Sequence, residues 1–153
     1  MTATKGFVVP AGGGTHLDMS APGRVAALKL FGHETDGSIM MFEETVPPGT
    51  MSSLHLHHDS DEVAWVLEGE ITFLIGDEIS IGGPGSCAFF PRDIRHAWKN
   101  SGAATGRVLF LYTPASAGKF IEDMKHRPTG MTEAERRELG RQYHWEILGP
   151  NPL

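Results

Sequence analysis

The chain is poor in cysteine and tyrosine. It contains one cysteine, Cys87, and two tyrosines among 153 residues. A single cysteine cannot form a disulfide within the chain, so a disulfide-stapled scaffold is excluded. Because Cys87 lies in an apolar run, we predict that it is a small core residue. Free cysteine is typical of reducing compartments, and we expect a cytoplasmic protein.

Long apolar runs and basic clusters are also missing. The apolar run at residues 7–10 is followed by glycines and is too short for a signal peptide or a membrane span. The 13 lysines and arginines are scattered and outnumbered by 19 acidic residues, which gives a formal net charge of -6. No basic stripe could follow a phosphate backbone. We therefore expect neither a membrane nor a nucleic acid as a partner.

Short apolar runs separated by turn residues fill the middle of the chain. They are 24–31, 38–46, 63–67, 71–75, 79–81, 86–90, 96–98 and 108–112. Turns at 34–37 and at Gly76-Asp77 predict hairpins, and residues 68–70 are short enough to join antiparallel neighbours. Strands do not alternate with long helices, so the pattern predicts an all-β sandwich or barrel.

The composition changes at both ends of this region. Residues 116–124 have the spacing of a short helix, residues 126–130 interrupt it, and Thr132 with Glu135 forms the pattern of a capping box for a second helix to about Gln142. An apolar content of 40% suffices for one core. We expect a single domain over 1–153: an arm (1–23) lying over the barrel or a partner subunit, a barrel (24–113), and C-terminal helices with a tail (114–153).

Histidine spacing indicates a metal site. His55 and His57 are two residues apart in a strand, so both side chains project to one face and His58 projects to the other. Two imidazoles on one side suit a borderline divalent metal. Glu62 follows a polar turn and could return to the same ion, and His96 would complete the set.

The His55-x-His57 pair alone is weak evidence, because such pairs are often solvated or packed in a core. Four potential ligands in a pattern that places them inside one barrel are stronger evidence. Three imidazoles and a carboxylate buried together would be costly without a metal. We therefore interpret His55, His57, Glu62 and His96 as ligands of one divalent transition metal.

These residues resemble the two motifs of the cupin superfamily. Gly49-x5-His55-x-His57-x4-Glu62-x6-Gly69 is similar to the first motif, and Gly85-x5-Pro91-x-Asp93-x2-His96-x3-Asn100 is similar to the second. Asp93 stands where the second motif usually has glycine. Aspartate tolerates left-handed turn conformations, so we expect the turn to be kept.

Further segments resemble small single-domain cupins that are described as like quercetin dioxygenase. They are residues 46–49, 61–73, 83–86 and 147–150. The resemblance implies a double-stranded β-helix, or jelly-roll barrel, with an open mouth above the metal and a homodimeric assembly. It also implies that Glu62 ligates the metal or accepts a substrate proton while dioxygen attacks the activated carbon. Iron, nickel, manganese, cobalt, copper and zinc all accept such ligands.

Aromatic residues near the motifs predict the lining of the mouth. Trp98 shares a face with His96, and Phe73 and Phe110 are further candidates, although core packing is the alternative for each. Arg92 and Arg95 flank the turn before His96 and are interpreted as exposed charges.

Three functional classes follow. The first is a metal-dependent dioxygenase for a small enol- or phenol-bearing, flavonol-like molecule. The second is a non-redox metal enzyme such as an isomerase, cyclase or lyase. The third is a non-catalytic binding or regulatory cupin, ranked last because the C-terminal 30–40 residues do not provide a DNA-reading helical domain.

Overall fold

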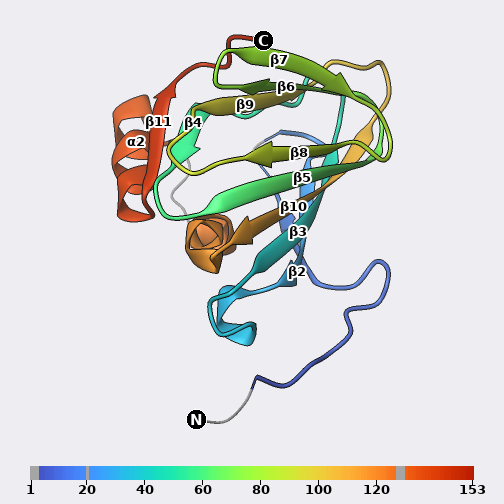
Figure 1. The fold of residues 1–153 in the computed structure, drawn as a ribbon, viewed down its shortest axis with the longest axis vertical. Helices are drawn as coiled ribbons and strands as arrows, with labels where there is room; N and C mark the ends of the chain where they lie inside the picture. The colour runs from blue at the N-terminus through green and yellow to red at the C-terminus, as the bar shows by residue number, and fades with distance from the viewer. Residues whose placement is uncertain (1–3, 20, 127–129) are drawn as a thin grey trace.

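Two antiparallel sheets face each other and form a barrel (Figure 1). The computed structural model describes residues 4–19, 21–126 and 130–153. In spatial order, the first sheet contains β1 (Thr15–Asp18), β2 (Val25–Leu30), β3 (Met40–Val46), β10 (Gly106–Thr113), β5 (Asp61–Glu68) and β8 (Cys87–Phe90). The second contains β11 (Trp145–Gly149), β4 (Leu54–His57), β9 (His96–Asn100), β6 (Ile71–Ile75) and β7 (Glu78–Gly82). The predicted all-β jelly roll is confirmed.

Alternation along the strands builds the core between the sheets. In β3 and β10 every second side chain is buried, as the period of two in a strand requires. Phe42 stacks on Phe110 with ring centroids 5.2 Å apart, and Trp98 of the opposite sheet lies 5.4 Å from Phe110. Offset and tilted rings at these distances pack favourably. The aromatic core thus joins the two sheets beside the histidine strands.

One predicted connection is wrong. The segment 68–70 does not join antiparallel neighbours, because β5 lies in the first sheet and β6 in the second. Gly69 makes this crossing possible: its φ is +85°, and a Cβ there would lie 2.8 Å from the Cα of Gly106. The Gly76-Asp77 hairpin is confirmed, since Ile75 pairs with Glu78.

The ends of the chain contribute more structure than the sequence predicts. β1 lies within the predicted arm and pairs with β2, and β11 lies within the predicted tail and pairs with β4. The helices are η1 (Gly32–Glu34), η2 (Ala115–Gly118), α1 (Lys119–Glu122), η3 (Asp123–His126) and α2 (Glu133–Gln142). The predicted helix at 116–124 is thus one short turn of α-helix between 3₁₀ turns, and part of the predicted break, 127–129, lies outside the described residues.

The capping box of α2 is confirmed. The amide of Glu135 donates to Thr132 Oγ1 at 3.2 Å, and the amide of Thr132 donates to Glu135 Oε2 at 2.7 Å. Strand β11 packs against α2 and pairs with the histidine strand β4 at the edge of the second sheet (Figure 1). No helix among the described residues is both long and apolar enough to cross a bilayer.

The prediction for Cys87 is wrong. Its side chain is exposed on the outer face of β8, whereas Ala88 and Phe90 point inward. A short apolar run in an edge strand presents one face to the core and one to the outside, and the sequence does not say which is which.

Candidate metal centre

Four side chains from three strands meet inside the barrel. His55 and His57 lie on β4, His96 lies on the neighbouring β9, and Glu62 lies at the start of β5 in the opposite sheet. His55 pairs directly with His96 in the sheet register. All four side chains are buried, and their ligand atoms lie within 4.8 Å of one another. Ligands about 2.1 Å from one ion and on opposite sides of it would be about 4.2 Å apart, so the four ligand atoms need to move inward only slightly to hold one ion.

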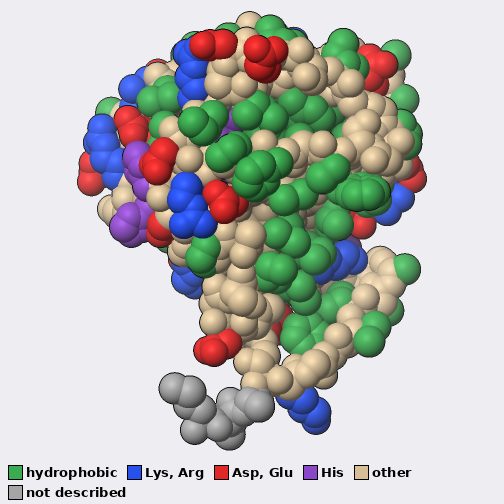
Figure 2. Space-filling model, in the orientation of Figure 1, with side chains coloured by type: hydrophobic (Ala, Val, Ile, Leu, Met, Phe, Trp, Pro, Cys, Tyr) green, Lys and Arg blue, Asp and Glu red, His purple; other side chains and the backbone are tan. Residues whose placement is uncertain are grey.

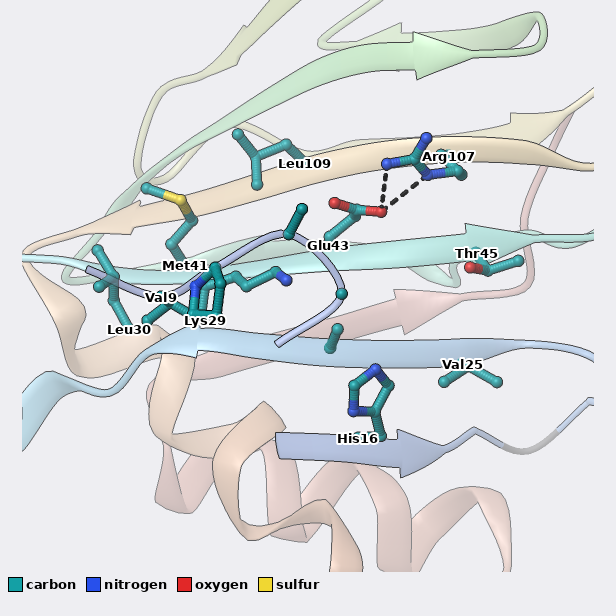
Figure 3. A pocket seen from close by; sticks show the side chains of 14 residues that line it. Val9, His16, Val25, Lys29, Leu30, Met41, Glu43, Thr45, Arg107 and Leu109 are labelled. Carbon is teal, nitrogen blue, oxygen red and sulfur yellow. Dashed lines mark hydrogen bonds and ion pairs between the residues drawn. The ribbon is translucent and has the colours of Figure 1, made fainter. Parts of the chain in front are cut away.

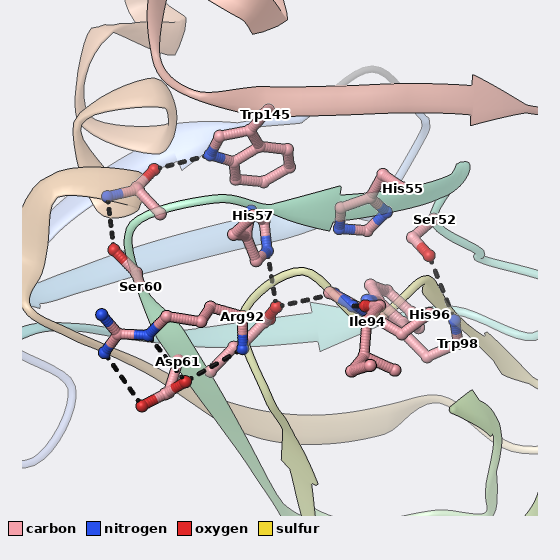
Figure 4. Close-up of polar contacts among 12 residues, drawn as sticks. Ser52, His55, His57, Ser60, Asp61, Arg92, Ile94, His96, Trp98 and Trp145 are labelled. Atoms are coloured by element: carbon pink, nitrogen blue, oxygen red, sulfur yellow. Dashed lines mark hydrogen bonds and ion pairs between the residues drawn. The ribbon is translucent and has the colours of Figure 1, made fainter. Parts of the chain in front are cut away.

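The carboxylate of Glu62 is the centre of the cluster. Its Oε2 lies 2.9 Å from His57 Nε2 and 3.0 Å from His96 Nε2 (Figure 4). The turn 58–60 reverses the chain between β4 and β5, which returns Glu62 to the face occupied by His57. The geometry therefore brings together all four of the residues that the sequence predicts as ligands.

Backbone contacts orient two of the imidazoles. His55 Nδ1 donates to the carbonyl of Ser53 at 2.7 Å, and His96 Nδ1 donates to the carbonyl of Ile94 at 3.1 Å. Each neutral ring then carries its lone pair on Nε2. In His96 that lone pair faces the Glu62 oxygen, which is unfavourable unless a proton or a cation lies between them. Such second contacts from Nδ1 are typical of metal-ligating histidines.

A further polar atom has no partner. His57 Nδ1 is buried and makes no hydrogen bond within the described residues. A buried polar atom without a partner is costly. The three imidazoles and one carboxylate buried beside it add to that cost when no ion is bound. The donor set therefore fits a divalent transition ion held by three nitrogens and one oxygen.

The charge states also suit a metal. Burial, followed by the proximity of His96, lowers the pKa of His55 well below its ordinary value, and burial lowers the pKa of His57. Burial would raise the pKa of Glu62, but its contacts with His57 and His96 lower it well below its ordinary value. Neutral imidazoles and an ionised carboxylate are the forms that bind metal.

The motif glycine position is occupied by Asp93, as predicted, without loss of the turn. Asp93 has φ of +65° and accepts a hydrogen bond from His58 Nδ1 at 2.7 Å, while His58 Nε2 contacts Glu146 at 2.9 Å. The His58 side chain is 47% exposed and points away from the cluster, as the strand alternation predicts. It joins β4, the turn at Asp93 and β11 from the outside.

Comparison with known proteins agrees with this geometry. Residues 42–112 match the cupin domain family, and they contain all four clustered residues. This match covers slightly less than half of the chain. The predicted resemblance to the cupin superfamily is confirmed, whereas the finer resemblance to quercetin dioxygenase stays a prediction.

Solved structures share the cupin fold. A predicted oxalate decarboxylase from Thermotoga maritima superposes with a TM-score of 0.65 at 21% identity, covering 70% of this chain and 98% of the other. A putative sugar phosphate isomerase from Acidithiobacillus ferrooxidans has a TM-score of 0.51 at 27% identity, covering 65% and 67%.

A curated relative is a transcriptional regulator. The HTH-type transcriptional regulator PuuR of Escherichia coli is 29% identical over 79 residues, which are 52% of this chain and 43% of the regulator. The match thus spans less than half of that relative's length.

The cluster of His55, His57, Glu62 and His96 opens into a cavity of about 260 Å³. His55 and Glu62 reach its wall, and Trp98 and Phe110 line it. Phe73 is not among the lining residues; it is buried against Phe90 at a ring distance of 5.9 Å. This volume is just below the lower end of the range for small-molecule pockets, which is about 300 Å³.

Trp145 of β11 is a wall residue that lies outside both motifs. Its indole stacks on His55 at 5.0 Å and meets the edge of His57 at 4.2 Å (Figure 4). The indole Nε1 donates to the carbonyl of Ala117 at 2.9 Å, which fixes the ring. The register places Trp145 directly opposite His57, so β11 covers two of the ligands.

Three polar side chains also lie at the cavity wall: Tyr112, Glu44 and Arg24. Tyr112 lies opposite Glu62 in the register of β10 and β5, and burial followed by the charges of Glu62 and Glu44 raises its pKa well above its ordinary value. Glu44, buried on β3, forms an ion pair with Arg24, and burial raises its pKa. Glu44 lies in a strand with ordinary alternation. The sequence would have indicated that Glu44 is buried only if the inward face of that strand had been known.

A second hollow of about 520 Å³ lies outside the barrel (Figure 3). It lies between residues 9–12 and the outer face of β2, β3 and β10. Arg107 Nε donates to Glu43 at 2.8 Å, and Lys29 Nζ donates to the carbonyl of Gly13 at 2.6 Å. These charges are already engaged, and no member of the histidine cluster lines this hollow. We therefore place the chemistry in the inner cavity.

Proposed function

We propose that this cupin is a metal-dependent dioxygenase that acts on a small molecule bearing an enol or phenol oxygen. The observation that carries the proposal is the buried cluster of His55, His57, Glu62 and His96 at the wall of an aromatic-lined cavity. A divalent ion bound there would act as a Lewis acid and lower the pKa of a coordinated hydroxyl.

Different residues would hold the ion, accept the substrate proton and contact the substrate. His55, His57 and His96 hold the ion, while Glu62 ligates it or accepts the proton of the substrate hydroxyl. Trp98, Phe110 and Trp145 exclude water and contact the flat faces of the substrate. Tyr112 keeps its proton at neutral pH, and its hydroxyl donates a hydrogen bond to the carboxylate of Glu62. The ring or enol carbon made electron-rich by loss of the hydroxyl proton would then be the site at which dioxygen adds.

Oxygen uptake tests the proposal directly. The purified protein is analysed for metal, reloaded with each candidate ion, and mixed with a flavonol and a panel of enediols in an oxygen electrode. We expect uptake with at least one pair of metal and substrate, and loss of that uptake in His96→Ala. A metal-replete protein that converts a panel member without consuming oxygen would contradict the dioxygenase and support a non-redox enzyme.

A non-redox isomerase, cyclase or lyase is the second candidate. The ion pair of Glu44 and Arg24 at the cavity wall favours it, because a buried carboxyl with a raised pKa can exchange protons with a substrate. The likeness to a putative sugar phosphate isomerase is compatible with such chemistry.

We also propose that the protein forms a homodimer through the outer face of β10, β5 and β8. Hydrophobic side chains gather over this face in Figure 2, and Trp65 and Phe89 there are 46% and 54% exposed. In the arm, Phe7 and Val8 are also exposed. A second copy related by a two-fold axis would cover both the face and the arm.

A further inference from the structure

The cavity has a second polar feature apart from the histidine cluster. Arg24, just before β2, pairs with the buried carboxylate of Glu44, and its guanidinium lies 5.5 Å from the ring centroid of Trp98. A carboxylate on one side and an indole on the other hold the guanidinium in place at the cavity wall. Arg24 is thus a positioned cation with a 16% exposed side chain.

The donors of Arg24 are only partly used. The contact with Glu44 is made by Nε, and the terminal nitrogens Nη1 and Nη2 donate no hydrogen bond to any described residue. A guanidinium presents five N–H donors in a planar fork that matches a carboxylate. The unused edge of Arg24 is therefore available to a ligand in the cavity.

Arg136 adds a second cation at the same cavity. It makes no ion pair with any described residue. Every other described arginine has a carboxylate partner: Arg24 has Glu44, Arg92 has Asp61, Arg95 has Asp77, Arg107 has Glu43 and Glu68, Arg137 has Glu133, and Arg141 has Glu138. Among the arginines that the structure describes, only Arg136 lacks a carboxylate partner, and its side chain is exposed at the rim of the cavity.

The charge of the loaded cavity is positive. The positive charge of Arg24 cancels the negative charge of Glu44. A bound divalent ion together with the carboxylate of Glu62 would leave a charge of +1, and Arg136 adds a further positive charge at the wall. A neutral flavonol would leave this charge uncompensated in a partly desolvated site. An organic anion would compensate it, and a carboxylate would also match the free edge of the guanidinium.

We propose that the substrate carries a carboxylate, which Arg24 binds inside the cavity while Arg136 attracts it at the wall. The proposal rests on the metal-dependent function above and narrows its substrate class to small enol or phenol acids. Glu44 is a positioning residue, because it orients Arg24 and leaves the terminal nitrogens free. Trp98 supports the guanidinium from its other side.

Two probes of equal size test the proposal by calorimetry. 3,4-Dihydroxybenzoate and 3,4-dihydroxybenzamide offer the same diol to the metal, and only the first carries a carboxylate. With nickel-loaded protein, we expect the acid to bind about tenfold or more tightly than the amide, because a charged carboxylate forms stronger hydrogen bonds with a guanidinium than a neutral amide does. The double variant Arg24→Gln/Glu44→Gln, which removes both charges of the pair together, should bind the two probes equally.

Arg136 supplies a variant that leaves the buried pair intact. Arg136→Gln should reduce the preference for the acid by about threefold, and raised ionic strength should reduce it further in the wild type. Arg137→Gln is the matched control, because Arg137 is the next residue on α2 and pairs with Glu133; it should keep the full preference.

Each outcome separates the two proposals. If the amide binds as tightly as the acid to wild-type protein, the carboxylate proposal is overturned while the metal cavity stands. A preference for the acid that survives in the double variant would overturn the role of Arg24. If neither probe binds the metal-loaded protein, the accessible metal site is refuted, and the carboxylate proposal falls with it.

Discussion

Replacing His57 with alanine should weaken metal binding strongly without abolishing the fold. The change removes one of three nitrogens in a cluster whose ligand atoms lie within 4.8 Å. Loss of even an outer contact to a metal site costs about 10–100-fold in affinity, so loss of a ligand should cost at least that much. In free energy this is about 1.4–2.7 kcal/mol or more of metal binding.

The same substitution also changes packing. The His57 ring is 1% exposed and contacts Trp145 and Tyr112 at centroid distances of 4.2 and 5.2 Å. Truncating a buried large side chain costs about 2–5 kcal/mol of folding free energy, depending on how far the site collapses. That cost is partly offset, because the substitution also removes the buried Nδ1 that lacks a partner.

The assay therefore measures binding and folding separately. Metal content is measured by elemental analysis, the dissociation constant by competition with a chelator at pH 7.5, and folding by circular dichroism of the metal-free protein. His58→Ala is the control, because the His58 side chain is 47% exposed and faces outward. Unchanged affinity in folded His57→Ala would refute the four-ligand assignment, and equal losses in the two variants would refute the strand register.

Three further predictions concern the rest of the chain. Trp145→Ala should lower stability by about 3–5 kcal/mol, seen as a fall of roughly 10 °C in the melting temperature, and a loss below about 1 kcal/mol would show that β11 does not cap the barrel. Phe89→Lys should convert the proposed dimer to monomer in analytical ultracentrifugation, and a variant that sediments like the wild type would exclude this face. Burial alone would raise the pKa of Asp123, but hydrogen bonds from Lys119 and Tyr143 lower it. The ionised form of Asp123 therefore stabilises the fold above its ordinary pKa of about 4, and this stabilisation is lost as the pH falls through the lowered pKa of the folded state. The difference in unfolding free energy between metal-free wild type and Asp123→Asn, measured in urea, should therefore shrink from pH 7 to pH 3. A difference that stays constant would contradict the assignment.

The ligand cluster is predictable because local rules determine it. The period of two places His55 and His57 on one face, and a short polar turn returns Glu62 to them. His96 comes from a distant segment, and only the second motif links it to the others. The left-handed turn at Asp93 was also predictable, because aspartate tolerates positive φ.

Sheet partners and outer faces were harder to predict. The strands on either side of Gly69 look like a hairpin, but their partners are chosen by packing between two sheets, which no short window of sequence contains. Cys87 shows the related problem, since alternation defines two faces without naming the buried one.

The cavity wall was missed for a different reason. Arg24, Arg136 and Trp145 lie outside both motifs, and they line the same cavity as His55 only in the folded chain, where Glu44 holds Arg24 and the pairing of β11 with β4 places Trp145 beside the histidines. The motif strands supply the clustered histidines and Trp98, whereas the segments outside the motifs add Arg24, Arg136 and Trp145 to the cavity wall. Related barrels can therefore keep the metal cluster while exchanging the outer segments, and substrate choice can change without any change in the motifs. For this chain, the residues at positions 24, 44 and 136 are the ones from which the substrate should be inferred.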